Sequence, residues 1–161
     1  MSHTHSALAT DAPAADAAID LGTLSGQIAY ALRRAQAAVF QDFVDTLDAE
    51  DIRPAQYSVL EVLRASPGRR QAQVSAALGI KTTNFVPLFD ALEAAGLAER
   101  RAISADRRAK GLFLSEQGAA MLDRLRARVI EHEARFIRRI GIEGKGQLLG
   151  LLARLQDPAF G

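Results

Sequence analysis

The residues whose types and spacing suggest chemistry stand together in one short polar loop. The loop contains Asp106, Arg107 and Arg108, and it joins two short runs of β-type sequence, Leu97–Arg101 and Ala109–Leu114. Arginine side chains at the tip of such a hairpin suit contact with phosphates or insertion into a narrow minor groove. A carboxylate is repelled by phosphate, so we expect Asp106 to orient an arginine or to close the turn.

The two segments that precede this hairpin have helical sequence character. Gln71–Leu78 and Lys81–Ala95 are separated by Gly79, a residue that favours a turn between helices. A helix pair at a glycine turn, followed by an arginine-tipped hairpin, is the outline of a winged helix-turn-helix. Arg101 stands at the end of the first β-type run, beside the loop, and is a further candidate for DNA contact. This order of elements predicts a protein that binds double-stranded DNA.

The second of these helices begins with polar residues that could read DNA. Lys81, Thr82, Thr83 and Asn84 follow one another at its N-terminal end, where the helix dipole favours phosphate. Asparagine can pair with adenine, and threonine methyl groups can touch the thymine methyl group. The alternative is that Thr82, Thr83 and Asn84 only cap the helix. Pro87 lacks an N–H, so either the helix bends there, or regular helix starts later and Pro87 sits within its first turns.

Positive charge is concentrated around these segments. The whole chain has a formal net charge of +1, and residues 1–20 contain aspartates but no lysine or arginine. Residues 69–110, in contrast, contain eight basic and four acidic side chains. A solvated basic surface would give the same count, but the order of helices and hairpin makes DNA the favoured partner.

Apolar periodicity outside this region predicts the helices that position it. Apolar residues at steps of three and four run along Leu21–Leu47, and a second helix begins at Pro54. Ser115 is expected to cap a further helix, which the glycines of 141–146 interrupt. The last helix carries leucines on nearly every side, at 148–155. We therefore expect a second copy of the chain to cover it.

Taken together, these residues resemble the MarR family of bacterial transcriptional regulators. The family's wing phrase is Asp-Arg-Arg, a short strand, and a Leu-Thr/Ser-x-x-Gly helix start, and it stands here at Asp106–Gly118. Residues 53–60 and 92–97 are also similar to family positions. The resemblance implies a mainly α fold with a small β-hairpin wing, a winged helix-turn-helix homodimer whose dimerisation region comes from both termini.

The resemblance also implies how functions are divided along the chain. Residues 1–20 read as a flexible tail ahead of a single MarR-like domain at 21–155. Residues 53–114 would form the winged helix-turn-helix, and 21–50 and 115–155 the dimerisation helices. Such a dimer is most often a repressor of a pseudo-palindromic operator, with half-sites roughly 34–36 Å apart.

Family members commonly respond to a small aromatic or phenolic acid or to its CoA thioester. A pocket for such an effector needs apolar walls and a few polar anchors, and arginine suits a carboxylate or phosphates. One alternative is that Arg33 and Arg34 are solvated or form ion pairs with aspartates across the dimer. For His132, the alternative is that it lies in the dimer interface with its hydrogen-bonding groups paired. The candidate effector residues are Tyr30, Arg33, Arg34, Phe40, Gln56, Tyr57 and His132.

Several classes of function find no support in the residues. The chain has no cysteine, which excludes disulfides and thiol redox sensing. Without a catalytic constellation or a phosphate loop, we expect no enzyme, no cofactor and no metal site. The absence of a long apolar run and of a signal sequence predicts a cytoplasmic protein with no membrane partner. The remaining alternative is a winged-helix adaptor that binds protein rather than specific DNA.

Overall fold

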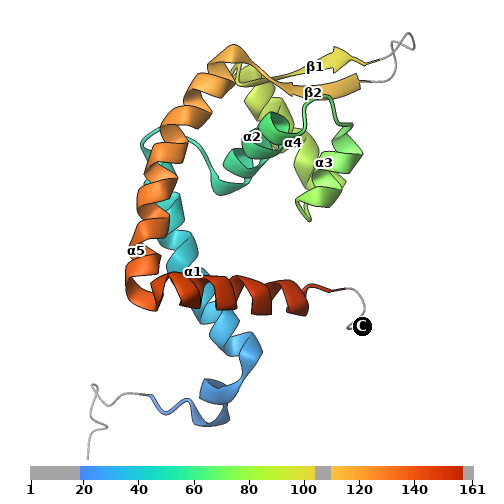
Figure 1. Cartoon of the computed structure of the whole chain (residues 1–161). Helices are drawn as coiled ribbons and strands as arrows, with labels where there is room; N and C mark the ends of the chain where they lie inside the picture. Colours follow the sequence, from blue (N-terminus) through green and yellow to red (C-terminus); the bar gives the residue numbers. More distant parts are fainter. Residues whose placement is uncertain (1–18, 104–109, 158–161) are drawn as a thin grey trace, which may run out of the picture. The chain divides into compact units, whose positions relative to one another are not determined.

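The computed structural model describes residues 19–103 and 110–157, which are drawn in colour in Figure 1. The chain forms two compact units, divided after Gln36. The first unit holds a short 3-10 helix, η1 (Gly22–Gly26), and the first residues of helix α1 (Ile28–Asp48). The expected helical start at Leu21 is wrong. Gly22 takes a left-handed φ of 52° and Gln27 is extended, so α1 begins only at Ile28.

The second unit contains the predicted helix-turn-helix. Helix α2 (Pro54–Ala65) starts on its proline, and α3 (Gln71–Ala77) and α4 (Thr82–Ala94) agree with the sequence-based bounds to within one residue. The turn between α3 and α4 depends on Gly79, whose φ of 65° lies in the region that favours glycine. This part of the prediction is confirmed.

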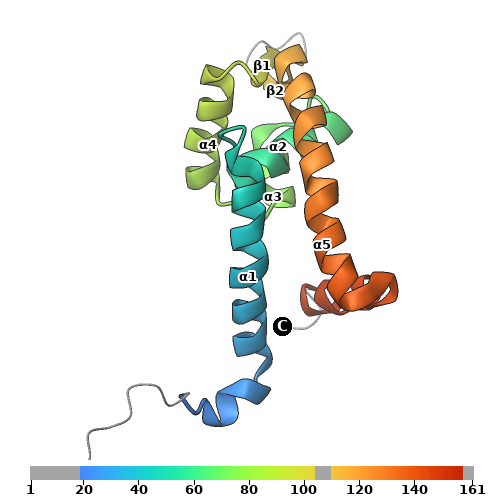
Figure 2. The ribbon, with the colours of Figure 1, turned by 90° about the vertical axis from the view of Figure 1, so that its left-hand side faces the viewer.

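The predicted hairpin is an antiparallel pair of strands, β1 (Ala98–Ala102) and β2 (Lys110–Leu114). The chain just before α3 adds a bridge to β2. Gly68 N donates to Leu112 O at 2.8 Å, and Leu112 N donates to Arg69 O at 2.9 Å. The hairpin is therefore attached to the segment that leads into the helix-turn-helix. Figures 1 and 2 show α2, α3 and α4 gathered beside it.

Helix α5 (Glu116–Leu155) begins where the sequence predicts. The Ser115 hydroxyl accepts a hydrogen bond from Gly118 N at 2.9 Å and donates one to Gly96 O at 2.6 Å. The helix is broken at Gly141, which has φ 76° and ψ 163°, and its ribbon turns sharply there in Figure 1. The predicted interruption is confirmed. Lys145 and Glu133 form an ion pair across the break, at 2.5 Å.

One apolar core holds α4 in place within the second unit. Phe85, Phe89 and Leu92 of α4 are fully buried, and the two phenyl rings stack with centroids 6.0 Å apart. They belong to one cluster with buried residues of α1, α2, α3, β1, β2 and α5. This core fixes which face of α4 stays outside. None of the helices described here is long and apolar enough to cross a bilayer.

Candidate nucleic-acid interface

The four polar residues at the start of α4 are all exposed. Lys81 occupies the N-cap position, and its side chain makes no capping hydrogen bond. Thr82, Thr83 and Asn84 lie inside the first turn, so they do not occupy the cap. Within residues 19–103 and 110–157, none of these three side chains forms a hydrogen bond. Their hydroxyl and amide groups, and the methyl groups of the threonines, remain available to a ligand.

Regular helix begins at Thr82 and continues through Pro87, which stands in its second turn. Proline lacks an N–H, so the carbonyl oxygen of Thr83 has no helical donor from that position. Pro87 is exposed, and Val86 beside it is 38% exposed. This stretch of α4 therefore presents C–H surface rather than charge.

Arg100 of β1 binds both acidic residues of α4. Its Nη2 lies 2.8 Å from Asp90 Oδ1, its Nη1 pairs with Glu93, and its backbone N donates to Glu93 Oε1 at 3.1 Å. Its guanidinium also covers the Phe89 ring, with Cζ 4.5 Å from the centroid. We name this group, Arg100 with Asp90, Glu93 and Phe89, the Arg100 cluster. It joins the hairpin to α4, and the one positive charge of Arg100 offsets part of the negative charge of two carboxylates that would repel phosphate.

The other basic residues of the region differ in whether their side chains contact other groups of the protein. Arg101, a predicted DNA contact, pairs with Glu99 and lies over the Phe113 ring, with Cζ 5.1 Å from the centroid. Further cations are exposed at Arg69, Arg70 and Lys110. Arg107 and Arg108 lie outside the described residues.

Two of the candidate effector residues are committed to contacts inside the protein. Gln56 Oε1 accepts a hydrogen bond from Arg53 N at 2.9 Å, an interaction that caps α2. The Tyr57 hydroxyl donates to Glu61 Oε1 at 2.7 Å, and Arg126 of α5 binds both oxygens of Glu61 at 2.9 and 2.6 Å. Burial and the hydrogen bond to Glu61 raise the pKa of Tyr57. This chain of contacts ties α2 to α5.

His132 is buried between aromatic rings and holds α5 against the C-terminal part of α1. Its Nδ1 lies 2.6 Å from Asp42 Oδ2, and its ring centroid is 5.1 Å from that of Phe43 and 5.0 Å from that of Phe136. Arg135 Nη2 donates to the same Asp42 oxygen at 2.8 Å. Asp42, on the same protomer, is therefore the partner of the Nδ1 atom of this histidine.

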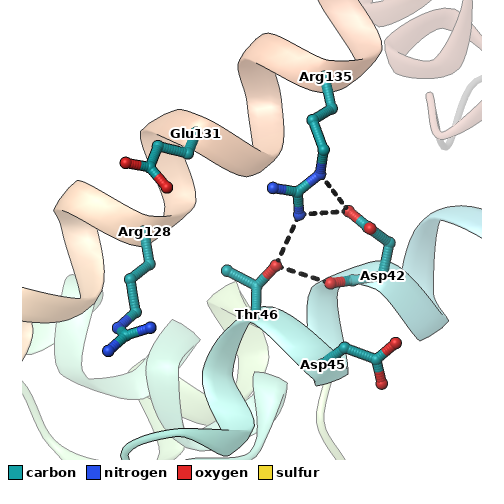
Figure 3. Close-up of a pocket in the computed structure, with 6 residues that line it drawn as sticks. All are labelled: Asp42, Asp45, Thr46, Arg128, Glu131 and Arg135. Atoms are coloured by element: carbon teal, nitrogen blue, oxygen red, sulfur yellow. Dashed lines mark hydrogen bonds and ion pairs between the residues drawn. The ribbon is translucent and has the colours of Figure 1, made fainter.

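A cavity of about 240 Å³ lies beside this network, between α1 and α5 (Figure 3). Arg135 Nη2 also donates to Thr46 Oγ1 at 3.0 Å, and Thr46 donates to the backbone oxygen of Asp42 at 2.7 Å. None of the candidate effector residues lines this cavity. Its walls are polar and of mixed charge: Asp42, Asp45, Thr46, Arg128, Glu131 and Arg135.

The remaining effector candidates lie on α1. Tyr30 and Arg33 belong to the first unit and contact each other, with the Arg33 Cζ 5.4 Å from the Tyr30 ring centroid. Arg34 is exposed, and Phe40, which belongs to the second unit, is 50% exposed. Among the residues that the structure describes, no group of three His, Asp or Glu side chains could hold a metal ion.

The contacts of Asp42 with His132 and Arg135 are expected to make the stability of the protein depend on pH at acid values. The hydrogen bond from Arg135, together with that from His132, lowers the pKa of Asp42 from its ordinary value of 3.8. A carboxylate with a lowered folded-state pKa stabilises the fold above its ordinary pKa, and this contribution is lost as the pH falls below that value. We expect urea unfolding midpoints between about pH 6 and about pH 3 to fall more steeply for the wild type than for Asp42→Asn. Parallel curves for the two proteins would contradict this.

Comparison with known proteins identifies the family. The model of the MarR family matches residues 50–109. A protein of Thauera aromatica described as a transcriptional regulatory protein for the hcr operon is 31% identical over 135 residues, which cover 83% of this chain and 81% of that protein. The chain belongs to the MarR family.

Solved structures of MarR regulators agree with this assignment. The transcriptional repressor CouR bound to a 23-mer DNA duplex is 39% identical, with a TM-score of 0.84, and the match covers 88% of this chain and all of that one. CouR bound to p-coumaroyl-CoA is 38% identical, with a TM-score of 0.80, over 88% of this chain and 99% of that one. The protein is therefore a transcriptional regulator of the MarR type with a winged helix-turn-helix fold.

Sequence reasoning missed several residues that organise this MarR fold. Arg100 was counted only as part of the positive charge, and Asp42 and Arg135 were not considered. Their partners lie on other elements, so local spacing contains no signal for them. The sequence did contain a local signal for Gln56. It stands three residues after Arg53, the N-cap of α2, and a glutamine at this spacing is typical of a capping box.

Proposed function

We propose that this regulator is a ligand-responsive repressor that binds double-stranded DNA as a homodimer. Its site would be a pseudo-palindrome, read by α4 and the wing of each protomer in successive major grooves. The observation that carries the proposal is the exposed polar start of α4, where the side chains of Lys81, Thr82, Thr83 and Asn84 are unengaged and the acidic residues later in the helix are paired with Arg100. The DNA-bound CouR structure, of the same fold and 39% identical, supports it.

Exposed apolar residues support the homodimer. In the last segment of α5, Leu148 is 46%, Leu149 55% and Leu151 56% exposed, which is unusual for leucines gathered on one segment. A second copy of the chain that covers this segment and the N-terminal helical region would remove this surface from water. Sedimentation at micromolar concentration should give a dimer, and a monomer would contradict the proposal.

The proposed effector is an aromatic acid or its CoA thioester. CouR, 38% identical to this chain, has been captured with p-coumaroyl-CoA. In this chain, the candidates whose polar groups or rings are least occupied by contacts within the protomer are Tyr30, Arg33, Arg34 and Phe40. Gel shifts with p-coumaric acid and with p-coumaroyl-CoA test the proposal. We expect one of the two to release the DNA, and no change with either would contradict an effector of this chemical class.

The wing provides a test of DNA binding. A gel shift against the intergenic DNA beside the gene should show retardation that is specific to sequence and sensitive to salt. Replacing both Arg107 and Arg108 by alanine should weaken this binding at least about tenfold and flatten its salt dependence, because fewer counterions are released. Unchanged affinity and slope would remove the wing from the interface. No retardation by the wild type at low salt would favour a protein-binding adaptor instead.

A further inference from the structure

The outer face of α4 carries unusually little charge for a helix that reads DNA. From Thr82 to Ala94 it contains no lysine, arginine or histidine, and its only charged residues are Asp90 and Glu93. Both carboxylates are bound by Arg100. The single positive charge of Arg100 offsets one of these two negative charges, and the first two turns of the helix, which precede Asp90, carry no charged side chain. Lys81, at the N-cap, directly precedes these turns in the chain.

The exposed side chains of the first two turns are rich in methyl and methylene groups. Phe85 and Phe89 are buried, so the helix turns Thr83 and Pro87, one turn apart, to the opposite side. Thr82 and Val86, also one turn apart, lie next to them. All four are exposed, with Val86 at 38%. We name Thr82, Thr83, Val86 and Pro87 the methyl patch.

The methyl patch offers few groups that could hydrogen-bond to a base. Val86 and the Pro87 ring have neither donor nor acceptor, and the peptide nitrogen of Pro87 carries no hydrogen. Within the first two turns, the threonine hydroxyls and the Asn84 amide are the side-chain groups that could do so. A surface of this kind distinguishes bases by apolar contact more than by hydrogen bonds.

The major groove presents one apolar group, the C5-methyl of thymine. Every base pair also offers polar atoms in this groove, including O4 of thymine, but only a pair that contains thymine offers a methyl group that C–H surface can pack against. We propose that the methyl patch of α4 selects the operator by packing Thr83, Val86 and Pro87 against thymine methyl groups. This inference rests on the proposed DNA-binding function. It identifies Val86 and Pro87 as residues that determine which DNA sequence is bound.

The experiment replaces thymine by uracil, which removes the methyl group and leaves the pairing unchanged. Binding sites are first selected by the wild-type protein from a pool of random-sequence duplexes. The recovered site is then made with thymine or with uracil, and Kd is measured for both. Burying one methyl group contributes about fourfold in affinity, so contacts in two half-sites should give a loss of about tenfold or more.

Variants of the protein identify the residues that distinguish thymine from uracil. The double variant Val86→Ala plus Pro87→Ala should reduce the ratio of the two Kd values to about twofold. Its folding is secure, because alanine at 87 restores an N–H donor for the Thr83 carbonyl and favours helix. Lys81→Ala is the matched control. It should weaken binding to both duplexes equally and leave their ratio unchanged.

Three outcomes of these measurements would each overturn a different part of the proposal. Equal Kd values for thymine and uracil duplexes would overturn the inference while leaving DNA binding intact. A ratio that persists in the double variant would overturn the assignment to Val86 and Pro87. Failure of the wild type to retain any sequence from the pool at low salt would overturn the proposed function itself, and this inference with it.

Discussion

Gly118→Ala is expected to lower the free energy of unfolding by about 3 kcal/mol or more. A Cβ at residue 118 would lie 1.9 Å from the carbonyl oxygen of Leu97 and 2.9 Å from Leu114 Cδ1. The backbone cannot move aside easily, because Leu97 O accepts from Ser115 N at 3.1 Å and Leu97 N donates to Leu92 O at 2.9 Å. Alanine would therefore separate the start of α5 from the end of α4 and from β1.

Gly146→Ala is the matched control for this prediction. It makes the same change in the same helix, at an exposed position where a new Cβ meets no atom within 4 Å. Because alanine favours helix over glycine, this variant should be as stable as the wild type or more stable by about 0.5–1 kcal/mol. Urea unfolding followed by circular dichroism measures both variants. A Gly118→Ala protein as stable as Gly146→Ala would disprove the close packing of α5 on Leu97.

Arg100→Ala is expected to weaken DNA binding by about tenfold and to destabilise the fold by about 1–3 kcal/mol. The arginine is 19% exposed, and its removal would uncover the Phe89 ring and leave Asp90 and Glu93 unpaired. Two uncompensated carboxylates on α4 would then face the phosphates of the proposed operator. Fluorescence anisotropy at several salt concentrations, on duplexes retained by the wild type, measures this effect.

A second substitution separates charge from structure. In the Arg100→Ala background, Asp90→Asn removes one stranded charge and should recover part of the lost affinity, although it restores no contact with Phe89. Arg124→Ala is the control, because it breaks an ion pair away from α4, between Arg124 on α5 and Glu50 in the segment between α1 and α2, and should leave DNA affinity unchanged. If Asp90→Asn recovers nothing, the Arg100 cluster acts through packing alone.

Local signals in the sequence determined most of the winged helix-turn-helix. The two runs of β-type sequence, the turn at Gly79 and the start of α2 at Pro54 each depend on residues close together in the chain, so their positions could be predicted to within about one residue. Ser115 was recognised as a helix cap for the same reason. The polar start of α4 was also visible, since a helix N-terminus is a local feature.

Other features depend on how distant segments pack, and only the tertiary structure decided them. The apolar stripe from Leu21 suggested helix throughout, but a 3-10 helix at Gly22–Gly26 and the extended backbone of Gln27 precede α1, which begins only at Ile28. His132 finds its partner Asp42 ninety residues away, and Arg100 finds Asp90 and Glu93 on another element. Periodicity shows which side of a helix is apolar, but it does not show which charged side chains will meet across two elements.

The division between the two kinds of information is clearest in α4. The sequence alone determined that a helix with Lys81, Thr82, Thr83 and Asn84 at its start follows a glycine turn. Only the packing of Phe85, Phe89 and Leu92 into the core decided which face remains outside, and only the position of Arg100 decided that both carboxylates of the helix are paired. The physical reason is that side-chain burial and ion pairing are set by contacts between elements, whereas helix formation is set largely by neighbours along the chain.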